Sequence, residues 1–374
     1  MIVYVLFISI IFIIQIFDKM LTSTNKQYYN GLNDKILKHT DIYKFMDNKK
    51  QKKSFTHLTL LAIIIIYLFS ALRFDVGWDY YHYYRTIEYD ALTNIVSLGE
   101  NGTIFLINLA KATGMTSLYF TLNSFICIYC IMVTIKNYSK DHWVSILFFV
   151  CFPLFFLNSF SVIRLFSALA LTFYGFKYIE RKEFKKYLLI VIIAGMLHKS
   201  AFAAIILYFV AHYIELKNSK LVAIYLALPI FSNLFEKFIL NYFPRYSIYF
   251  RETSLQEGTK AIYVFIVIAI VAILFRKKII EDDITASLYY NIFFAGLAIY
   301  LAFIKQGTLG HRFSLYGTIY SILLVPKIIS IFRNNWDRIL IKFIIYFLCI
   351  IMFLFTVYVG ADTYIPYQTI FGIK

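Results

Sequence analysis

Charged side chains are scarce in this chain: 16% of its 374 residues are Asp, Glu, Lys or Arg, whereas 60% are hydrophobic. A water-soluble fold cannot cover so much apolar surface, so this scarcity excludes a soluble protein. A helix needs roughly 20 apolar residues to cross a hydrocarbon layer about 30 Å thick, and apolar runs of that order recur along the whole sequence. We therefore predict an all-α fold, a polytopic integral membrane protein with one transmembrane domain over 1–374, about twelve transmembrane helices or eleven, and no soluble domain.

Residues that bind metals or nucleotides in recognisable patterns are also few. The sequence has no HExxH motif, no pair of CxxC motifs and no carboxylate cluster, so we expect chemistry that needs neither a metal nor a cofactor. It has no P-loop and no glycine-rich phosphate cradle, which argues against catalysis on the cytosolic side. The cysteines all lie in or beside apolar runs, where packing is the usual role, and they are Cys127, Cys130, Cys151 and Cys349.

The charge that is present is mostly positive, with 37 Lys and Arg against 21 Asp and Glu. Nine lysines lie between residues 18 and 54, and the turns at 136–140, 177–186 and 276–278 are also basic. Basic loops mark the cytoplasmic side of a membrane protein. These loops and anionic lipid account for the positive balance, so we expect a lipid bilayer as partner and no nucleic acid.

The apolar runs predict the path of the chain through the membrane. The first run ends in Asp18 and Lys19 without a small-residue cleavage site, which indicates a retained anchor. We place spans at 2–17, 57–72, 116–135, 143–160, 162–179, 187–198, 200–214, 221–235, 261–275, 284–304, 313–331 and 340–359.

One segment leaves the topology open. Residues 187–214 form a nearly continuous apolar run that only His198 and Lys199 interrupt, so they are either one long helix or two short ones. A single helix would reverse the sidedness of everything that follows, and we favour two. In that arrangement 18–56 is a basic cytoplasmic loop, and the outer side receives the loops 73–115 and 236–260 and the tail 360–374.

The densest polar cluster, residues 73–85, directly follows the second span. Arg73 offers a fixed fork of donors that suits phosphate, and Asp75 and Asp79 are candidates for a base or for an orienting group. The aromatic residues Tyr80, Tyr83 and Tyr84 could stack on sugar rings. An interfacial aromatic belt with an Arg–Asp pair explains the same composition equally well.

Three further sites place ionisable groups inside or beside apolar sequence. Arg164 is flanked by apolar residues, and a lone cation in hydrocarbon costs about 3 kcal/mol or more, so it needs a partner or must reach the headgroups. His198 and Lys199 interrupt a span, and histidine can exchange a proton near neutral pH. His311 and Arg312 follow a glycine-containing turn and could add another cation that faces phosphate.

These clusters, taken in order, resemble the EpsG/Wzy-like family of membrane polysaccharide polymerases. The matching features are an arginine followed by Gly-x-Asp-Tyr-x-x-Tyr, an arginine that opens a later span with small residues after it, the run His-Lys-Ser-Ala, and a late Pro-Tyr pair. In this sequence they are Arg73, Gly77, Asp79, Tyr80 and Tyr83, then Arg164, Ala168 and Ala170, then His198 to Ala201, and Pro366 and Tyr367.

The resemblance implies a bacterial enzyme of O-antigen, capsule or exopolysaccharide synthesis. Such an enzyme transfers a growing glycan from polyprenyl pyrophosphate to a lipid-linked repeat unit, outside the cytoplasmic membrane. Arg73, Arg164 and Arg312 would stabilise the leaving pyrophosphate, and the base would be Asp79 or, with slightly less support, His198. Residues expected to contact substrate are Asp75, Tyr80, Tyr83, Tyr84, Lys199, His311 and Tyr367. Partners would be the polyprenyl-pyrophosphate-linked oligosaccharide and a protein that sets chain length.

Two other functions fit the same sequence. A glycan ligase shares the chemistry and the topology of the polymerase. A flippase or exporter for lipid-linked glycan would also need many helices and basic contacts, but transporters usually concentrate polar groups near the bilayer midplane and often have repeated halves. No internal repeat is visible here, and the candidate charges collect at one membrane face, which favours an enzyme.

Overall fold

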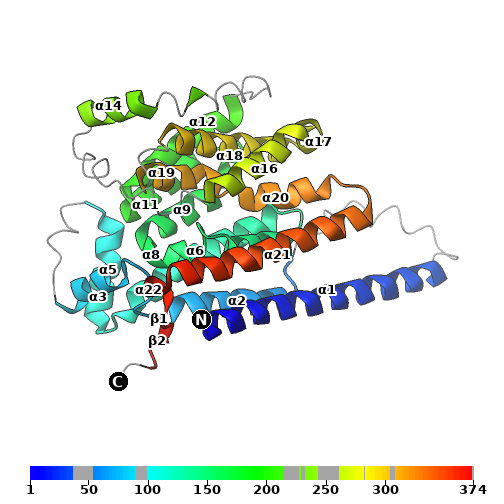
Figure 1. Ribbon diagram of the computed structural model, residues 1–374, viewed down its shortest axis with the longest axis horizontal. Coiled ribbons are helices and arrows are strands. Elements are labelled where there is room, and N and C mark those ends of the chain that lie inside the picture. Colours follow the sequence, from blue (N-terminus) through cyan, green and yellow to red (C-terminus); the bar gives the residue numbers. More distant parts are fainter. Residues whose placement is uncertain are drawn as a thin grey trace.

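The computed structural model describes residues 1–36, 54–89, 99–213, 227–228, 232–242, 261–281, 283–303 and 308–372. Within these ranges the fold is all-α apart from one two-stranded ribbon (Figure 1), as the composition predicted. The helices are α1 (Ile2–Ile36), α2 (His57–Ala71), α3 (Tyr80–Glu88), α5 (Asn101–Thr113), α6 (Ser117–Tyr138), α7 (His142–Cys151), α8 (Asn158–Ser161), α9 (Ile163–Tyr174), α10 (Phe176–Glu180), α11 (Phe184–Leu197), the 3-10 helix η2 (Lys199–Ala204), α12 (Ile205–Tyr213), α14 (Ser232–Tyr242), α16 (Ala261–Leu274), α17 (Arg276–Ile280), α18 (Ile284–Ala302), α19 (Thr308–Thr318), α20 (Ser321–Ser330), α21 (Asn335–Val359) and α22 (Ala361–Tyr364).

Several of these helices can cross a membrane. Among the described residues, four are long and apolar enough: α1 over Ile2–Thr24, α6, α18 and α21. The bent pair α19 and α20, which turns by 44°, would be a fifth. Shorter apolar helices are α2, α7, the η2–α12 unit and α16. The chain is therefore an integral membrane protein, whereas the figure of twelve spans stays a prediction.

The predicted span at 143–160 is interrupted because of Pro153. Phe152 precedes the proline and adopts an extended conformation, with ψ of 127°, as the proline ring requires of its neighbour. Helix α7 ends at Cys151, and the chain turns before α8 begins at Asn158. A hydropathy pattern cannot show this break, because the residues around it remain apolar.

The open question at residues 187–214 is settled by ring contacts. The Phe184 ring lies 5.4 Å from that of Phe209, and the Tyr187 ring lies 6.0 Å from that of Tyr208. The first residues of α11 therefore meet the last part of α12, so the two helices run antiparallel. The turn falls at His198, which is extended between α11 and η2. The two-helix interpretation is confirmed.

Segments predicted as loops contain regular structure. α1 continues to Ile36 through part of the basic 18–56 segment, and α3 and α5 lie within 73–115. In the tail 360–374, α22 is followed by strand β2 (Gln368–Thr369), which pairs antiparallel with β1 (Arg73–Phe74). α14 reaches into 236–260, and residues 243–260 lie outside the described part, as does most of the predicted span 221–235.

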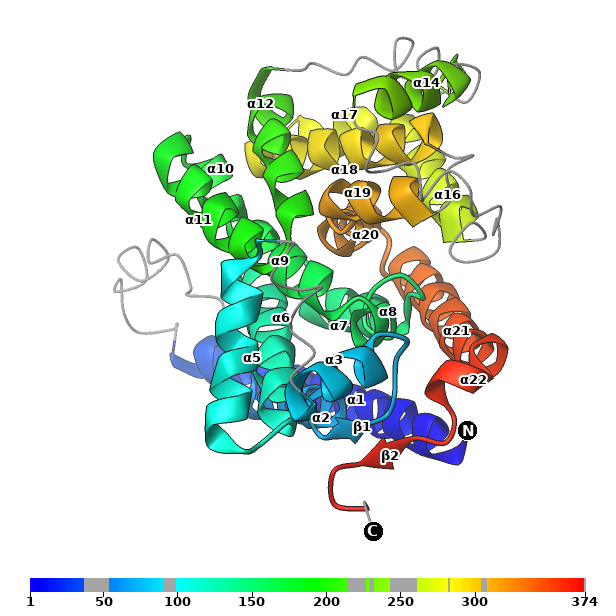
Figure 2. The ribbon, with the colours of Figure 1, turned by 90° about the vertical axis from the view of Figure 1, so that its left-hand side faces the viewer.

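The long helices lie side by side, and several short elements gather at one end of the bundle. Figure 1 shows α3, α5, α8, α22 and the ribbon at the left end, with α17 at the right. Figure 2 looks onto that left end, where α5 and α3 stand in front of α6. The last residue of α11 and the first turn of α9 contact the start of α5, which brings several candidate residues to one face.

Close packing of α18 against α19 depends on two glycines. A Cβ added to Gly296 would lie 2.5 Å from the backbone nitrogen of Thr318, and one on Gly317 would lie 2.5 Å from the Cα of Gly296. Such contacts between small residues let membrane helices approach closely.

Gly296→Val should therefore force α18 and α19 apart and destabilise the protein by about 1–3 kcal/mol. The measurement is the thermal unfolding midpoint of the purified protein in detergent. Gly372→Val is the control, because its nearest neighbour would be 3.6 Å away. Equal midpoints for the two variants would contradict this packing account.

Candidate functional site

Four candidate residues from separate parts of the chain lie close enough to influence one another's charge, in α3, α9, α11 and α19 or beside them. They are Asp79 before α3, Arg164 in the first turn of α9, His198 in the turn after α11, and Arg312 in α19. Burial raises the pKa of Asp79 above its ordinary value, and the charges of Arg312 and Arg164 oppose this shift. The charges of the same two arginines lower the pKa of His198. Asp79 and His198 thus both lie within electrostatic reach of the two arginines, and we call these four groups the cationic cluster.

Arg164 has a buried acidic partner. Its Nη1 donates a hydrogen bond to Oε2 of Glu100, and the side chains of Arg164 and Glu100 are 20% and 5% exposed. The other carboxylate oxygen of Glu100 accepts from the backbone N–H of Lys199 at 3.1 Å. The Arg164 guanidinium also lies 5.6 Å from the centroid of the Tyr83 ring. Glu100 therefore fixes the arginine and the turn after α11 together.

Sequence reasoning missed Glu100. The available signal was the requirement that a cation among apolar residues must have a partner. Glu100 is one of the few acidic residues in the 73–115 segment, but only the fold places it next to Arg164.

His198 is held in one orientation by η2. Its Nδ1 accepts from the backbone N–H of Ser200 at 3.2 Å and lies 2.7 Å from the Ser200 hydroxyl, which in turn lies 2.9 Å from the hydroxyl of Tyr316 in α19. Burial in this turn lowers the pKa of His198 to about 3, and the charges of Arg164 and Arg312 contribute to the shift. The ring is therefore neutral at pH 7. Because Nδ1 is an acceptor, the proton sits on Nε2.

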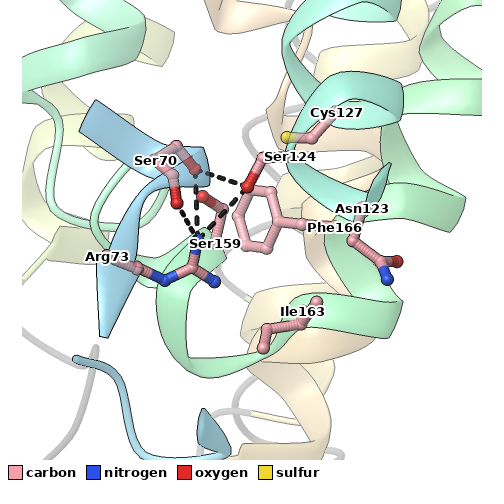
Figure 3. Close-up of a pocket in the computed structure, with 8 residues that line it drawn as sticks. All are labelled: Ser70, Arg73, Asn123, Ser124, Cys127, Ser159, Ile163 and Phe166. Atoms are coloured by element: carbon pink, nitrogen blue, oxygen red, sulfur yellow. Dashed lines mark hydrogen bonds between the residues drawn. The ribbon is translucent and has the colours of Figure 1, made fainter. Parts of the chain in front are cut away.

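Arg73 lies apart from the cationic cluster. It is 1% exposed, and its Nη1 donates to the backbone carbonyl of Ser70 and to the hydroxyl of Ser124 at 3.2 Å (Figure 3). Its Nε donates to the carbonyl of Val76 at 3.3 Å, and its guanidinium lies 4.6 Å from the Phe160 ring centroid. Burial lowers the pKa of Arg73 to about 10, so it stays charged at pH 7. The small pocket beside it has room for about one water molecule.

Gly77, part of the same motif, allows this arrangement. Its φ is +107°, and an added Cβ would lie 2.2 Å from the carbonyl oxygen of Phe160. Only glycine lets the loop before α3 pass so close to the α8 segment. The loop carries Asp79 toward Arg164.

The aromatic candidates are mostly packed. Tyr80 stacks on Phe120 with ring centroids 3.9 Å apart, and Tyr83 is 1% exposed. Tyr367 donates to the carbonyl of Phe69 at 2.6 Å. Tyr84 is half-buried.

The remaining candidates lie around the cluster. Asp75 is exposed and has a φ of 52°, and Lys199 is also exposed. Nε2 of His311 lies 3.2 Å from the side-chain nitrogen of Asn158, so His311 is held between α19 and α8. Among the described residues, no three His, Cys, Asp or Glu side chains are grouped closely enough to hold a metal ion. Two arginines and an imidazole N–H suit an anionic ligand instead.

The fold and this cluster define an integral membrane protein with an anion-suited site at one end of its helices. The model of the EpsG family matches residues 56–369, which is most of the chain. The chain therefore belongs to the EpsG family, and the resemblance on short motifs is confirmed. Membership indicates a role in polysaccharide synthesis at a membrane. No curated protein and no solved structure matches the chain.

Glu100→Ala should destabilise the protein by about 3–5 kcal/mol, because it leaves the Arg164 charge largely buried without its partner. Replacing Glu183 by Ala is the matched control, since its pair with Lys186 is largely exposed and should contribute less than about 1 kcal/mol. Chemical denaturation in detergent measures both changes. Similar losses for the two variants would show that the Glu100–Arg164 pair does not hold this end of the fold.

Proposed function

We propose that this protein is a glycosyltransferase that polymerises oligosaccharide repeat units carried on polyprenyl pyrophosphate. It would act at the outer face of a bacterial cytoplasmic membrane, with about twelve spans. The observation that carries the proposal is that Asp79 lies within electrostatic reach of Arg164 and Arg312, and that the buried pair with Glu100 fixes Arg164 there. Family membership supports the polysaccharide substrate.

The arginines suit the leaving group. As the acceptor hydroxyl oxygen attacks the anomeric carbon, the bond from that carbon to the phosphate oxygen breaks and its electron pair leaves with the pyrophosphate. Charge then develops on the phosphate oxygen, and fixed cations beside it lower the barrier. Glu100 and Tyr83 already hold Arg164 in place, so little reorganisation is needed.

Asp79 is the better candidate for the base that takes the acceptor proton. Its carboxylate is half-buried, and a raised pKa makes it a stronger base than an exposed aspartate. His198 presents an N–H at Nε2, so its suitable role is to donate a hydrogen bond to a phosphate or sugar oxygen. Arg73 is buried, and it donates a hydrogen bond to the carbonyl of Val76. We therefore propose that it fixes the loop that carries Asp79.

The remaining residues divide by exposure. Asp75, Tyr84 and Lys199 retain accessible surface and would contact the glycan or its lipid carrier. His311 would orient α8 through Asn158. Tyr80, Tyr83 and Tyr367 would contact the glycan only with the edges of their rings, because the rings are packed against other side chains. A separate protein would set the chain length.

The position of the cluster favours an enzyme over a flippase. The charged groups lie at helix ends and in turns, not near the middle of the long helices where transporters bind substrate. A ligase would use the same site, so product length must separate the two activities.

Deletion of the gene should reduce the surface glycan from a ladder of lengths to single repeat units. Wild type should restore the ladder, and Asp79→Asn or Arg164→Ala should lower polymer formation about 100-fold or more at equal membrane abundance. Gel separation of the extracted glycan measures the ladder, with Lys186→Ala as an exposed control. Long polymer without attachment in the deletion strain would indicate a ligase, and no glycan outside would indicate a flippase.

The rate should also depend on pH through Asp79. A base must be deprotonated, so activity should fall as the pH drops through a pKa raised above the ordinary aspartate value. Polymerisation in membrane vesicles across a pH series measures this limb. His198→Ala should retain it, whereas the residual activity of Asp79→Asn should lack it; an unchanged limb in Asp79→Asn would exclude this residue as the base.

A further inference from the structure

A second polar site lies at the opposite end of the helices that carry the cationic cluster. Helix α6 has Tyr119, a residue within electrostatic reach of Arg164, near its start and Tyr138 at its end. Its 22 residues give a length of about 33 Å, close to the thickness of the hydrocarbon layer. A site beside Tyr138 is therefore about one membrane thickness from the cationic cluster.

The second site is a pocket of about 390 Å³, within the size range of small-molecule sites. It is formed by the end of α6, by α10 and by the start of α18, and we call it the basic-end pocket. Its lining residues are Asn137, Tyr138, Lys140, Lys177, Glu180, Arg181, Asp283, Thr285 and Tyr289. The pocket lies between the segments 136–140 and 177–186, which are among the basic ones expected on the cytoplasmic side.

The two carboxylates of this pocket already have partners. Asp283 pairs with Lys140 and with Lys327, both at 2.9 Å. Glu180 accepts from the Tyr138 hydroxyl at 2.9 Å and from the Thr285 hydroxyl at 2.7 Å. Two lysines therefore compensate the charge of Asp283, and both oxygens of Glu180 already accept hydrogen bonds, which disfavours a metal cation as the ligand.

Two cations in the pocket have no acidic partner among the residues that the structure describes. The ion pairs found among the described residues include neither Lys177 nor Arg181, although the Lys177 ammonium lies 3.7 Å from the centroid of the Tyr174 ring. Arg181 is exposed at the end of α10. The pocket thus keeps a net positive charge after its own pairs are formed.

An unpartnered hydroxyl also points to a ligand. Tyr289 lines the pocket and is 1% exposed, and its hydroxyl has no hydrogen-bond partner among the described residues. Buried hydroxyls are nearly always hydrogen-bonded, and leaving one unpaired is costly. A ligand oxygen in the pocket would satisfy it.

We propose that the basic-end pocket binds a phosphorylated polyol, as a lipid headgroup or as a free molecule. The forked donors of Arg181 and the ammonium of Lys177 suit the phosphate oxygens. The Asn137 amide and the remaining lone pairs of Glu180 suit the hydroxyl groups beside the phosphate. Anionic lipids are concentrated at the basic face of such proteins. This site is separate from the proposed transferase site and does not depend on its activity.

The test measures binding to the purified full chain in neutral detergent, by isothermal titration, with two probes. One probe is glycerol phosphate, and the other is dioleoyl phosphatidylglycerol in mixed micelles, with phosphatidylcholine as the neutral comparison. The double variant Lys177→Gln, Arg181→Gln should bind about tenfold more weakly or worse, because two charge-assisted contacts are lost. Lys186→Gln, an exposed basic residue beyond the pocket, should bind as wild type does.

Each outcome decides the proposal. Binding of both probes shows that the headgroup alone is recognised, and binding of only one identifies the lipid or the free molecule as the source. Tyr289→Phe, which keeps the ring, provides a second variant if the double variant folds poorly, and it should weaken binding severalfold. No binding of either probe, or equal affinity in wild type and the variants, overturns the proposal.

Discussion

The buried ion pair between Arg164 and Glu100 is the interaction on which the site end of this protein depends. A cation beside the membrane needs compensation, and Glu100 supplies it while its second oxygen accepts from the N–H of Lys199. The same region is tied once more by the Thr103 hydroxyl, which donates to the carbonyl of Leu197 at 2.8 Å. One carboxylate therefore joins α5, α9 and the turn after α11.

This constraint explains how a bundle of apolar helices can present ordered charge. Apolar packing is not directional, so it cannot by itself orient a guanidinium. The ion pair and the Ser200–Tyr316 contact place Arg164 and His198 on one face, near Asp79 and Arg312. The basic-end pocket follows the same rule at the other end, where two lysines pair with Asp283 and two hydroxyl groups donate hydrogen bonds to Glu180.

The sequence predicted the membrane class and several helices because apolar runs of spanning length have few alternatives. Residues 116–135 and 284–304 correspond to α6 and α18 within a few positions. The break at Pro153 was not predicted, because the residues around it remain apolar. The helices inside the predicted loops were not predicted either, because their sequences are polar. The site was predictable in part, because a cation among apolar residues costs free energy, and this identified Arg164 as a candidate. Its partner and the burial of Arg73 depend on tertiary contacts, which spacing does not encode.

The central claim is that the cationic cluster transfers a glycan between lipid pyrophosphate carriers. The most direct measurement is reconstitution of the purified protein in liposomes with a polyprenyl-pyrophosphate-linked repeat unit and no nucleotide sugar, followed by mass spectrometry of the products. We expect glycans of two or more repeats together with released polyprenyl pyrophosphate, and neither product with Arg164→Ala. Unchanged single repeat units from correctly folded wild-type protein, whether or not they cross the bilayer, would contradict it.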